Sequence, residues 1–129
     1  MSKTAYEKVR EFHETYGLLI AEKPEFPDDR TTTLRMNLIE EEFLELQSAL
    51  ADKDLVGVAD ALTDLQYVIL GMMISYGIDG DKCFDEVHRS NMSKLDNGRV
   101  IRRPSDGKIL KGPMYSPPNL EKILFGDKA

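Results

Sequence analysis

The segment Leu65–Ile74 restricts the fold of this chain more than any other, because it is apolar on nearly every side of a helix. A helix of this kind is stable only when neighbouring elements cover it all round. A chain of 129 residues has few further helices with which to cover it. We therefore expect an all-α fold, a bundle of four to five helices that completes its core by forming an oligomer.

Periodicity, capping residues and turn residues divide the chain into helices and an irregular arm. We expect helices over residues 4–20, 32–51, 55–76 and 81–95, with Asp28, Asp29 or Thr31 capping the second and Asp54 the third. After residue 96, the apolar pairs at 100–101 and 109–110 and the turn dipeptides at 97–98 and 106–107 predict a small hairpin or an extended arm. Only residues 120–125 suit a last helical turn. The predicted organisation is one domain, with a helical body over 1–96 and an arm over 97–129.

The charges are divided unevenly along the chain, whose net charge is -6. Residues 1–96 carry 10 basic and 20 acidic side chains, whereas residues 97–129 carry seven and three. An acidic body does not favour nucleic acid as a partner. A single cysteine excludes an intramolecular disulfide, the first residues show no apolar leader, and the apolar stretch at 65–76 is too short to cross a bilayer. These features favour a cytoplasmic protein without a membrane partner.

Carboxylates occupy positions on the second helix that should face inward. Its apolar face is expected to contain Leu38, Ile39, Phe43, Leu46, Ala49 and Leu50. Glu42 falls within this face, Glu45 borders it and Glu41 lies at its edge. Arg35 shares the same face two turns earlier, which makes it a candidate substrate contact.

The third helix repeats this pattern. Asp60 and Asp64 are one turn apart and share a face, and the small residues Gly57, Gly71 and Ser75 line the same side. Small residues beside inward-facing acids leave room for a close helix or for a ligand.

Several buried carboxylates that meet in one bundle need a cation between them, because each is costly to bury unpaired. Hard oxygen ligands favour Mg²⁺, with Mn²⁺ as the alternative. A second interpretation stays open, in which Glu42 and Glu45 pair with Arg35 or with lysines of a partner helix. In that case Asp60 and Asp64 would bond helix ends.

Amide and basic side chains near the end of the fourth helix and in the arm complement these acids. Asn91 lies within the apolar face of the fourth helix and Lys94 at its edge, an arrangement that suits a phosphate or nucleotide beside a metal. The arm contributes five basic residues and one aromatic residue: Arg99, Arg102, Arg103, Lys108, Lys111 and Tyr115. Such an arm can fold over a polyphosphate and stack on a base, or it can equally pack on a neighbouring subunit.

Two groups of residues resemble a known family. Glu41-Glu42-Phe-Leu-Glu45 followed by Asp60-Ala-Leu-Thr-Asp64 resembles the E-E-x-x-E … E-x-x-D signature of the all-α nucleoside triphosphate pyrophosphohydrolases. These include MazG-like proteins, dimeric dUTPases and phosphoribosyl-ATP pyrophosphohydrolase. The run from Val87 to Lys94, together with residues 106–113 and 117–118, resembles a MazG-related branch with an extended C-terminal arm. Ala61 stands where the signature has glutamate, and Asp60 is the expected substitute.

The resemblance implies a Mg²⁺-dependent enzyme that cleaves a (deoxy)nucleoside triphosphate to the monophosphate and pyrophosphate, and that works as a homodimer or homotetramer. Carried over residue by residue, it makes Glu42, Glu45 and Asp64 metal ligands. Glu41 becomes a further ligand or the base that activates water, and Asn91 and Lys94 contact the nucleotide or its phosphates. Two alternatives remain: hydrolysis of phosphoribosyl-ATP, and a non-catalytic helical module that binds metal or nucleotide.

Overall fold

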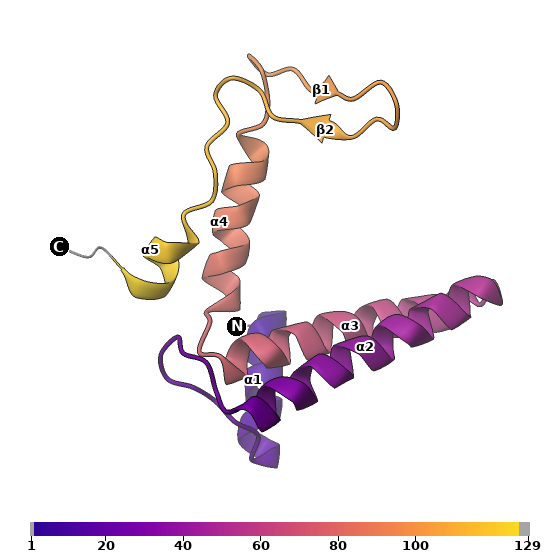
Figure 1. Cartoon of the computed structure of the whole chain (residues 1–129), viewed down its shortest axis with the longest axis vertical. Coiled ribbons are helices and arrows are strands. Elements are labelled where there is room, and N and C mark those ends of the chain that lie inside the picture. The colour runs from indigo at the N-terminus through magenta and orange to yellow at the C-terminus, as the bar shows by residue number, and fades with distance from the viewer. Residues whose placement is uncertain (1, 127–129) are drawn as a thin grey trace. The chain divides into compact units, whose positions relative to one another are not determined.

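The computed structural model describes residues 2–126, and within them the protein is helical with one small hairpin (Figure 1). In chain order the elements are α1 (Ala5–Tyr16), α2 (Asp29–Ala51), α3 (Leu55–Ser75), α4 (Gly80–Met92), β1 (Ile101–Arg102), β2 (Ile109–Leu110) and α5 (Leu120–Phe125). The predicted all-α class, the hairpin and the last helical turn are confirmed. Residues 127–129 of the predicted arm lie outside the described residues.

Polar side chains cap the N-terminal ends of α1, α2 and α3. The Thr4 hydroxyl accepts a hydrogen bond from the Glu7 amide at 3.1 Å, and the Glu7 carboxylate accepts one from the Thr4 amide at 2.8 Å. Asp28 and Asp54 cap α2 and α3 as predicted. The first helix ends at Tyr16 instead of residue 20, because Gly17 adopts a left-handed conformation (φ 69°) that terminates it.

The chain divides into two compact units, one ending at Gly80 and the other beginning at Asp81. The first unit contains α1, α2 and α3. Helices α2 and α3 lie side by side as an antiparallel pair (Figure 1), and α1 packs on the C-terminal half of α3, where Phe12 contacts Tyr67.

A repeat of seven residues governs how α2 meets α3. Ala49 faces Gly57, where an added Cβ would lie 3.1 Å from the Ala49 Cβ. Seven residues away on each helix Glu42 faces Asp64, and seven further on Arg35 lies against Gly71. This is the spacing at which two helices keep one seam in contact, so small residues and the predicted acids share a single interface.

In the single chain several residues that the sequence predicts to face inward are exposed, and the oligomer expected to complete the core stays a prediction. The expected inner residues Phe43 and Leu50 of α2 are exposed, and so are Tyr67 and Ile69 within the stretch expected to be buried all round. Helix α2 lies along one side of α3 and α1 covers part of another side, and among the described residues no further helix of this unit lies against what remains. The periodicity identifies apolar faces correctly, but it does not supply the elements that would cover them.

Helix α3 is also longer than the apolar stretch from which its length was judged. Its 21 residues are long and apolar enough for a helix that could cross a membrane, by length and composition only. The prediction concerned residues 65–76 alone, whereas the helix that is long and apolar enough begins at Leu55. Core helices of soluble proteins have the same length and composition, and α3 carries Asp60 and Asp64 within its length.

The second unit consists of α4, the hairpin and the returning arm. Ile101 pairs with Leu110 and Arg102 with Ile109 in antiparallel register. Helix α4 ends at Met92, three residues before the predicted end, because the Ser93 hydroxyl donates to the Ser90 carbonyl at 2.6 Å. The chain then turns into the arm.

Candidate metal and substrate site

Three of the predicted carboxylates meet between α2 and α3. One oxygen from each of Glu42, Glu45 and Asp64 lies within 4.8 Å of the others. Glu42 and Glu45 are three residues apart on one face of α2, and the seven-residue seam places Asp64 of α3 opposite them. We refer to these three residues as the carboxylate cluster.

The environment of Glu42 favours its neutral form. Burial, a hydrogen bond with Glu45 and the charges of Glu45, Asp64 and Asp60 together raise the pKa of Glu42 from 4.5 to about 7. Its Oε2 atom is buried and has no hydrogen-bond partner among the described residues. A buried acceptor without a donor is costly, so this carboxyl group requires either a proton or a cation.

The cluster fits a hard divalent cation. Its ligand atoms are carboxylate oxygens only, which favours Mg²⁺ or Mn²⁺ over a softer metal. The buried Oε2 of Glu42, which has no hydrogen-bond partner among the described residues, is an oxygen that a bound cation would satisfy. Glu42, Glu45 and Asp64 are therefore the residues that could hold the ion.

The other two predicted acids lie beside this cluster and not within it. Glu41 and Asp60 are exposed. Asp60 is close enough for its charge to raise the pKa of Glu42. Both acids remain available to a ligand, and the roles predicted for them stay predictions.

Arg35 is buried two turns before Glu42. It is 6% exposed, burial lowers its pKa, and its Nε has no hydrogen-bond partner within residues 2–126. The guanidinium lies over Gly71, where any side chain would collide with it. Among residues 2–126 no carboxylate forms an ion pair with Arg35, so the alternative in which it neutralises Glu42 or Glu45 finds no support.

His13 lies near Arg35 and shares a hydrogen-bonding carbonyl with Ser75. His13 Nδ1 lies 3.1 Å from the Leu19 carbonyl, and the Ser75 hydroxyl donates to the same oxygen at 3.0 Å. Burial lowers the pKa of His13, and the nearby charge of Arg35 adds to this effect. The neutral imidazole thus has a structural role here.

The remaining predicted residues belong to the second unit. Asn91 is exposed, although the helical pattern predicted it inside, and Lys108 is exposed in the turn of the hairpin. The Gly112 amide donates to the Lys94 carbonyl at 2.8 Å, which ties the arm to the end of α4. Lys111 Nζ lies 4.7 Å from the centre of the Tyr115 ring. Within this unit the structure therefore brings the arm, with Lys111 and Tyr115, back to Lys94.

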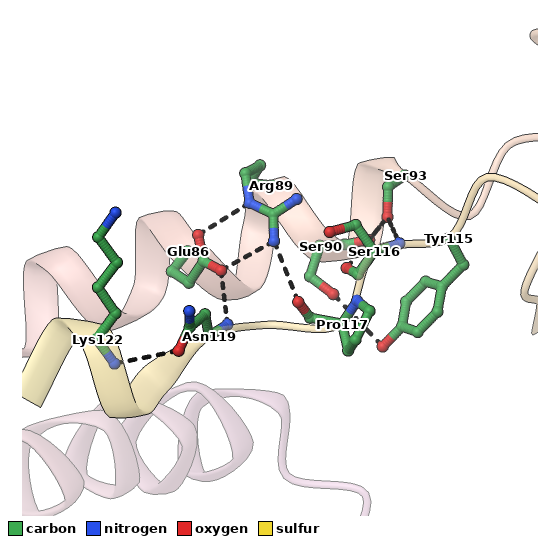
Figure 2. A network of polar contacts seen from close by, with 9 residues as sticks. All are labelled: Glu86, Arg89, Ser90, Ser93, Tyr115, Ser116, Pro117, Asn119 and Lys122. Atoms are coloured by element: carbon green, nitrogen blue, oxygen red, sulfur yellow. Dashed lines mark hydrogen bonds and ion pairs between the residues drawn. The ribbon is translucent and has the colours of Figure 1, made fainter. Parts of the chain in front are cut away.

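A polar network that the sequence did not reveal holds the arm on α4 (Figure 2). Arg89 donates two hydrogen bonds of 2.9 Å to Glu86 and one of 3.2 Å to the Pro117 carbonyl. The Asn119 amide donates to Glu86 at 2.7 Å, and the Ser116 amide donates to Ser93 at 2.8 Å. The spacing of Glu86 and Arg89 could have suggested a pair within one helix, but nothing in the sequence identifies their partners in the arm.

The larger of two described cavities, about 670 Å³, lies along this network. Its charged groups already satisfy one another, since the bonds from Arg89 and Asn119 lower the pKa of Glu86 to about 2. The carboxylate cluster, with its unsatisfied oxygen, is therefore the better candidate for chemistry.

Comparison with known proteins places the chain in a family. A model of the family described as phosphoribosyl-ATP pyrophosphohydrolase matches residues 9–91. An uncharacterised protein of Acanthamoeba polyphaga mimivirus is 35% identical over 82 residues, which are 60% of this chain and 33% of the viral protein. The chain thus spans about a third of the length of this relative.

One solved structure is also similar, that of a provisionally assigned NTP pyrophosphohydrolase from Exiguobacterium sp. 255-15. It is 27% identical and the match covers 92% of this chain and 90% of the other, with a TM-score of 0.46. This TM-score is too low for the structural similarity to support a family assignment. The family match does carry one, because it covers more than half of the chain and includes Glu42, Glu45 and Asp64. The resemblance inferred from the acidic motifs is confirmed, and the chain belongs to the phosphoribosyl-ATP pyrophosphohydrolase family.

Proposed function

We propose that this protein is a Mg²⁺-dependent nucleotide pyrophosphohydrolase that converts a (deoxy)nucleoside triphosphate into the monophosphate and pyrophosphate. The observation that carries the proposal is the carboxylate cluster, in which one buried oxygen of Glu42 has no hydrogen-bond partner in the described part of the chain. Family membership supports the reaction class.

Different acidic residues of the chain have different roles in this reaction. Mg²⁺, when bound, supplies positive charge that neutralises phosphate oxygens and lowers the pKa of water. Glu42, Glu45 and Asp64 would hold the ion, and Asp60 would add negative charge close by. Exposed Glu41 takes a proton from the water that attacks the α-phosphorus, while the bond from that phosphorus to the bridging oxygen breaks and pyrophosphate leaves.

Basic and amide side chains of the second unit complete the proposal. We assign Lys94 the role of stabilising the negative charge that builds up on the phosphates, and Asn91 the role of contacting the nucleotide. Lys108, Lys111 and Tyr115 are assigned to the substrate as well, and so is Arg35 of the first unit. Each assignment predicts a higher KM, a lower kcat or both when the side chain is removed.

Substitution of the cluster tests the proposal directly. Glu42→Gln and Asp64→Asn keep the shape of each side chain but remove its charge, so we expect pyrophosphate release to fall at least about 100-fold. Exposed Glu40 lies outside the cluster, and Glu40→Gln is the matched control that should leave the rate unchanged. The assay screens canonical, deoxy and damaged nucleoside triphosphates with Mg²⁺ and with Mn²⁺. Variants as active as the parent would contradict the proposed mechanism.

A second candidate substrate is phosphoribosyl-ATP, which the description of the matching family favours. It contains the same triphosphate chemistry, so the same cluster would serve. Including it in the screen decides between the two substrates. Metal and nucleotide binding without turnover of any substrate would instead identify a non-catalytic module.

The proposal also includes self-association and a cytoplasmic setting. Many apolar side chains of α2 and α3 are exposed in the single chain, among them Leu44, Leu55 and Val56. Contiguous exposed apolar surface is typical of an interface. We propose that a homodimer or homotetramer covers it.

A further inference from the structure

Three aromatic rings form an open groove on the first unit, apart from the carboxylate cluster. The groove lies along one face of α1 and is closed on one side by Tyr67 of α3, with a volume of about 610 Å³. We refer to it as the aromatic groove, lined by Phe12, Tyr16 and Tyr67 together with Lys3, Lys8 and Glu11. A cavity of this size can take a small molecule.

The rings are arranged around Phe12. Its centre is 4.5 Å from that of Tyr16 with an interplanar angle of 44°, and 5.6 Å from that of Tyr67 in an edge-to-face contact at 86°. All three residues are exposed. Aromatic side chains usually bury this apolar area, so the group presents ring surface that residues 2–126 leave exposed.

Polar groups border the rings. Lys3 Nζ forms an ion pair with a Glu11 carboxylate oxygen at 2.9 Å, and Lys8 lines the same groove. The groove therefore combines flat apolar surface with donors and an acceptor at its rim. This combination suits a planar heterocycle with polar edges better than it suits an aliphatic chain.

The groove begins one helical turn from the carboxylate cluster. Tyr67 follows Asp64 by three residues on α3, and residues at this spacing are neighbours on a helix surface, with Cβ atoms about 5–6 Å apart. A ligand with a phosphate at the cluster and a ring attached to it through a sugar would place that ring in this neighbourhood. Both features belong to the first unit.

We propose that the aromatic groove binds the base of the substrate nucleotide, with Tyr16 and Tyr67 stacking on it and the rim contributing to base preference. The inference rests on the proposed function, since it names the part of the substrate that the cluster does not hold. Stacking tolerates every base, so the rings supply affinity and the polar rim supplies selectivity.

Calorimetric titration tests this without requiring turnover. The probes are the α,β-methylene analogues of ATP, GTP, CTP and UTP, and inorganic tripolyphosphate, each with Mg²⁺. We expect Tyr16→Ala and Tyr67→Leu to weaken the best nucleotide about tenfold or more, and to leave tripolyphosphate, which has no base, unchanged. Tyr16 is 67% exposed, so its replacement should not disturb the fold.

Phe26→Ala is the matched control. Phe26 is 87% exposed and contacts Tyr76 edge-to-face at 5.5 Å, so it repeats the aromatic pair outside the groove within the same unit. This variant should bind every probe as the parent does.

The outcomes separate the two proposals. Unchanged nucleotide affinity in both groove variants overturns the groove assignment, even if the parent hydrolyses nucleotides. Loss of tripolyphosphate binding as well, or a change in oligomeric state by light scattering, also overturns it, because the groove would then support the cluster or bind a second copy. Nucleotide affinity that depends on the groove in a protein that releases no pyrophosphate supports the groove and contradicts the proposed function. A parent that binds no nucleotide contradicts both.

Discussion

At the scale of single residues, the protonation of Glu42 connects the proposed metal binding with the stability of the fold. Its pKa is about 7 in the folded protein and 4.5 when unperturbed. The folded state therefore holds this proton over a pH range in which the unfolded chain has released it. Because a cation and the proton compete for the same oxygens, metal binding should tighten as the pH rises toward 7.

A pH series without metal tests this link. The stabilisation from protonated Glu42 is complete below about pH 4.5 and is lost as the pH rises to about 7. We expect the loss from this group to be about 1 kcal/mol, since solvent screens a half-exposed site. Denaturant unfolding from pH 5 to 8 measures it, and saturating Mg²⁺ should offset the loss. Glu42→Gln should flatten this part of the metal-free profile, and a wild-type slope in that variant would assign the effect to another group.

Arg35 gives a second prediction at this scale. Its buried guanidinium has no carboxylate partner among the described residues, and a buried charge without a partner is costly. We expect Arg35→Met to melt at the same temperature as the parent or higher, while KM for the nucleotide rises about tenfold. Exposed Arg30 provides the control, since Arg30→Met should change neither quantity. A loss of stability above about 2 kcal/mol would show that the guanidinium stabilises the fold.

At the scale of elements, the arm depends on the Glu86–Arg89 pair for its place on α4. Glu86 receives bonds from both Arg89 and the Asn119 amide. We expect Glu86→Gln to release residues 115–119 from α4, and hydrogen exchange at these amides should rise while the far-ultraviolet circular dichroism stays unchanged. Asp85→Asn alters the exposed neighbour and should leave exchange unaffected. Protection that persists in Glu86→Gln would contradict the role given to this pair.

Sequence alone predicted the elements well because their causes are local. Asp28 caps α2 and Asp54 caps α3 through contacts within a few residues. The carboxylate cluster was also predictable, because helical spacing selects one face of each helix and short loops make them neighbours. The network that fixes the arm joins residues about 30 positions apart, and no local pattern specifies such a pairing.

At the scale of the whole molecule, the described chain leaves its apolar faces uncovered. Leu55 and Val56 at the start of α3 are 80% and 81% exposed. The sequence identified these helices as apolar but could not say whether a segment of this chain or another copy covers them.

Light scattering coupled to size exclusion measures the assembly. We expect a dimer or tetramer for the parent, and Val56→Lys should shift it toward the monomer, because a charge within an apolar interface is costly. Met114→Lys, at an exposed position of the arm, is the control that should keep the parent's mass. A parent that is monomeric at all concentrations would contradict the oligomer.

The seven-residue repeat between α2 and α3 also restricts how this pair of antiparallel helices can change in length. Ala49 with Gly57, Glu42 with Asp64, and Arg35 with Gly71 are successive layers of one seam. Removing or adding one residue between the cluster and the end of either helix would rotate the part of that helix beyond the change by about 100°. Glu42 and Glu45 would then no longer face Asp64. Insertion or deletion of whole repeats, seven residues in each helix beyond the cluster, would keep the acids opposed. The end of the helix pair at which α2 connects to α3 can therefore lengthen or shorten only by seven residues in each helix at a time.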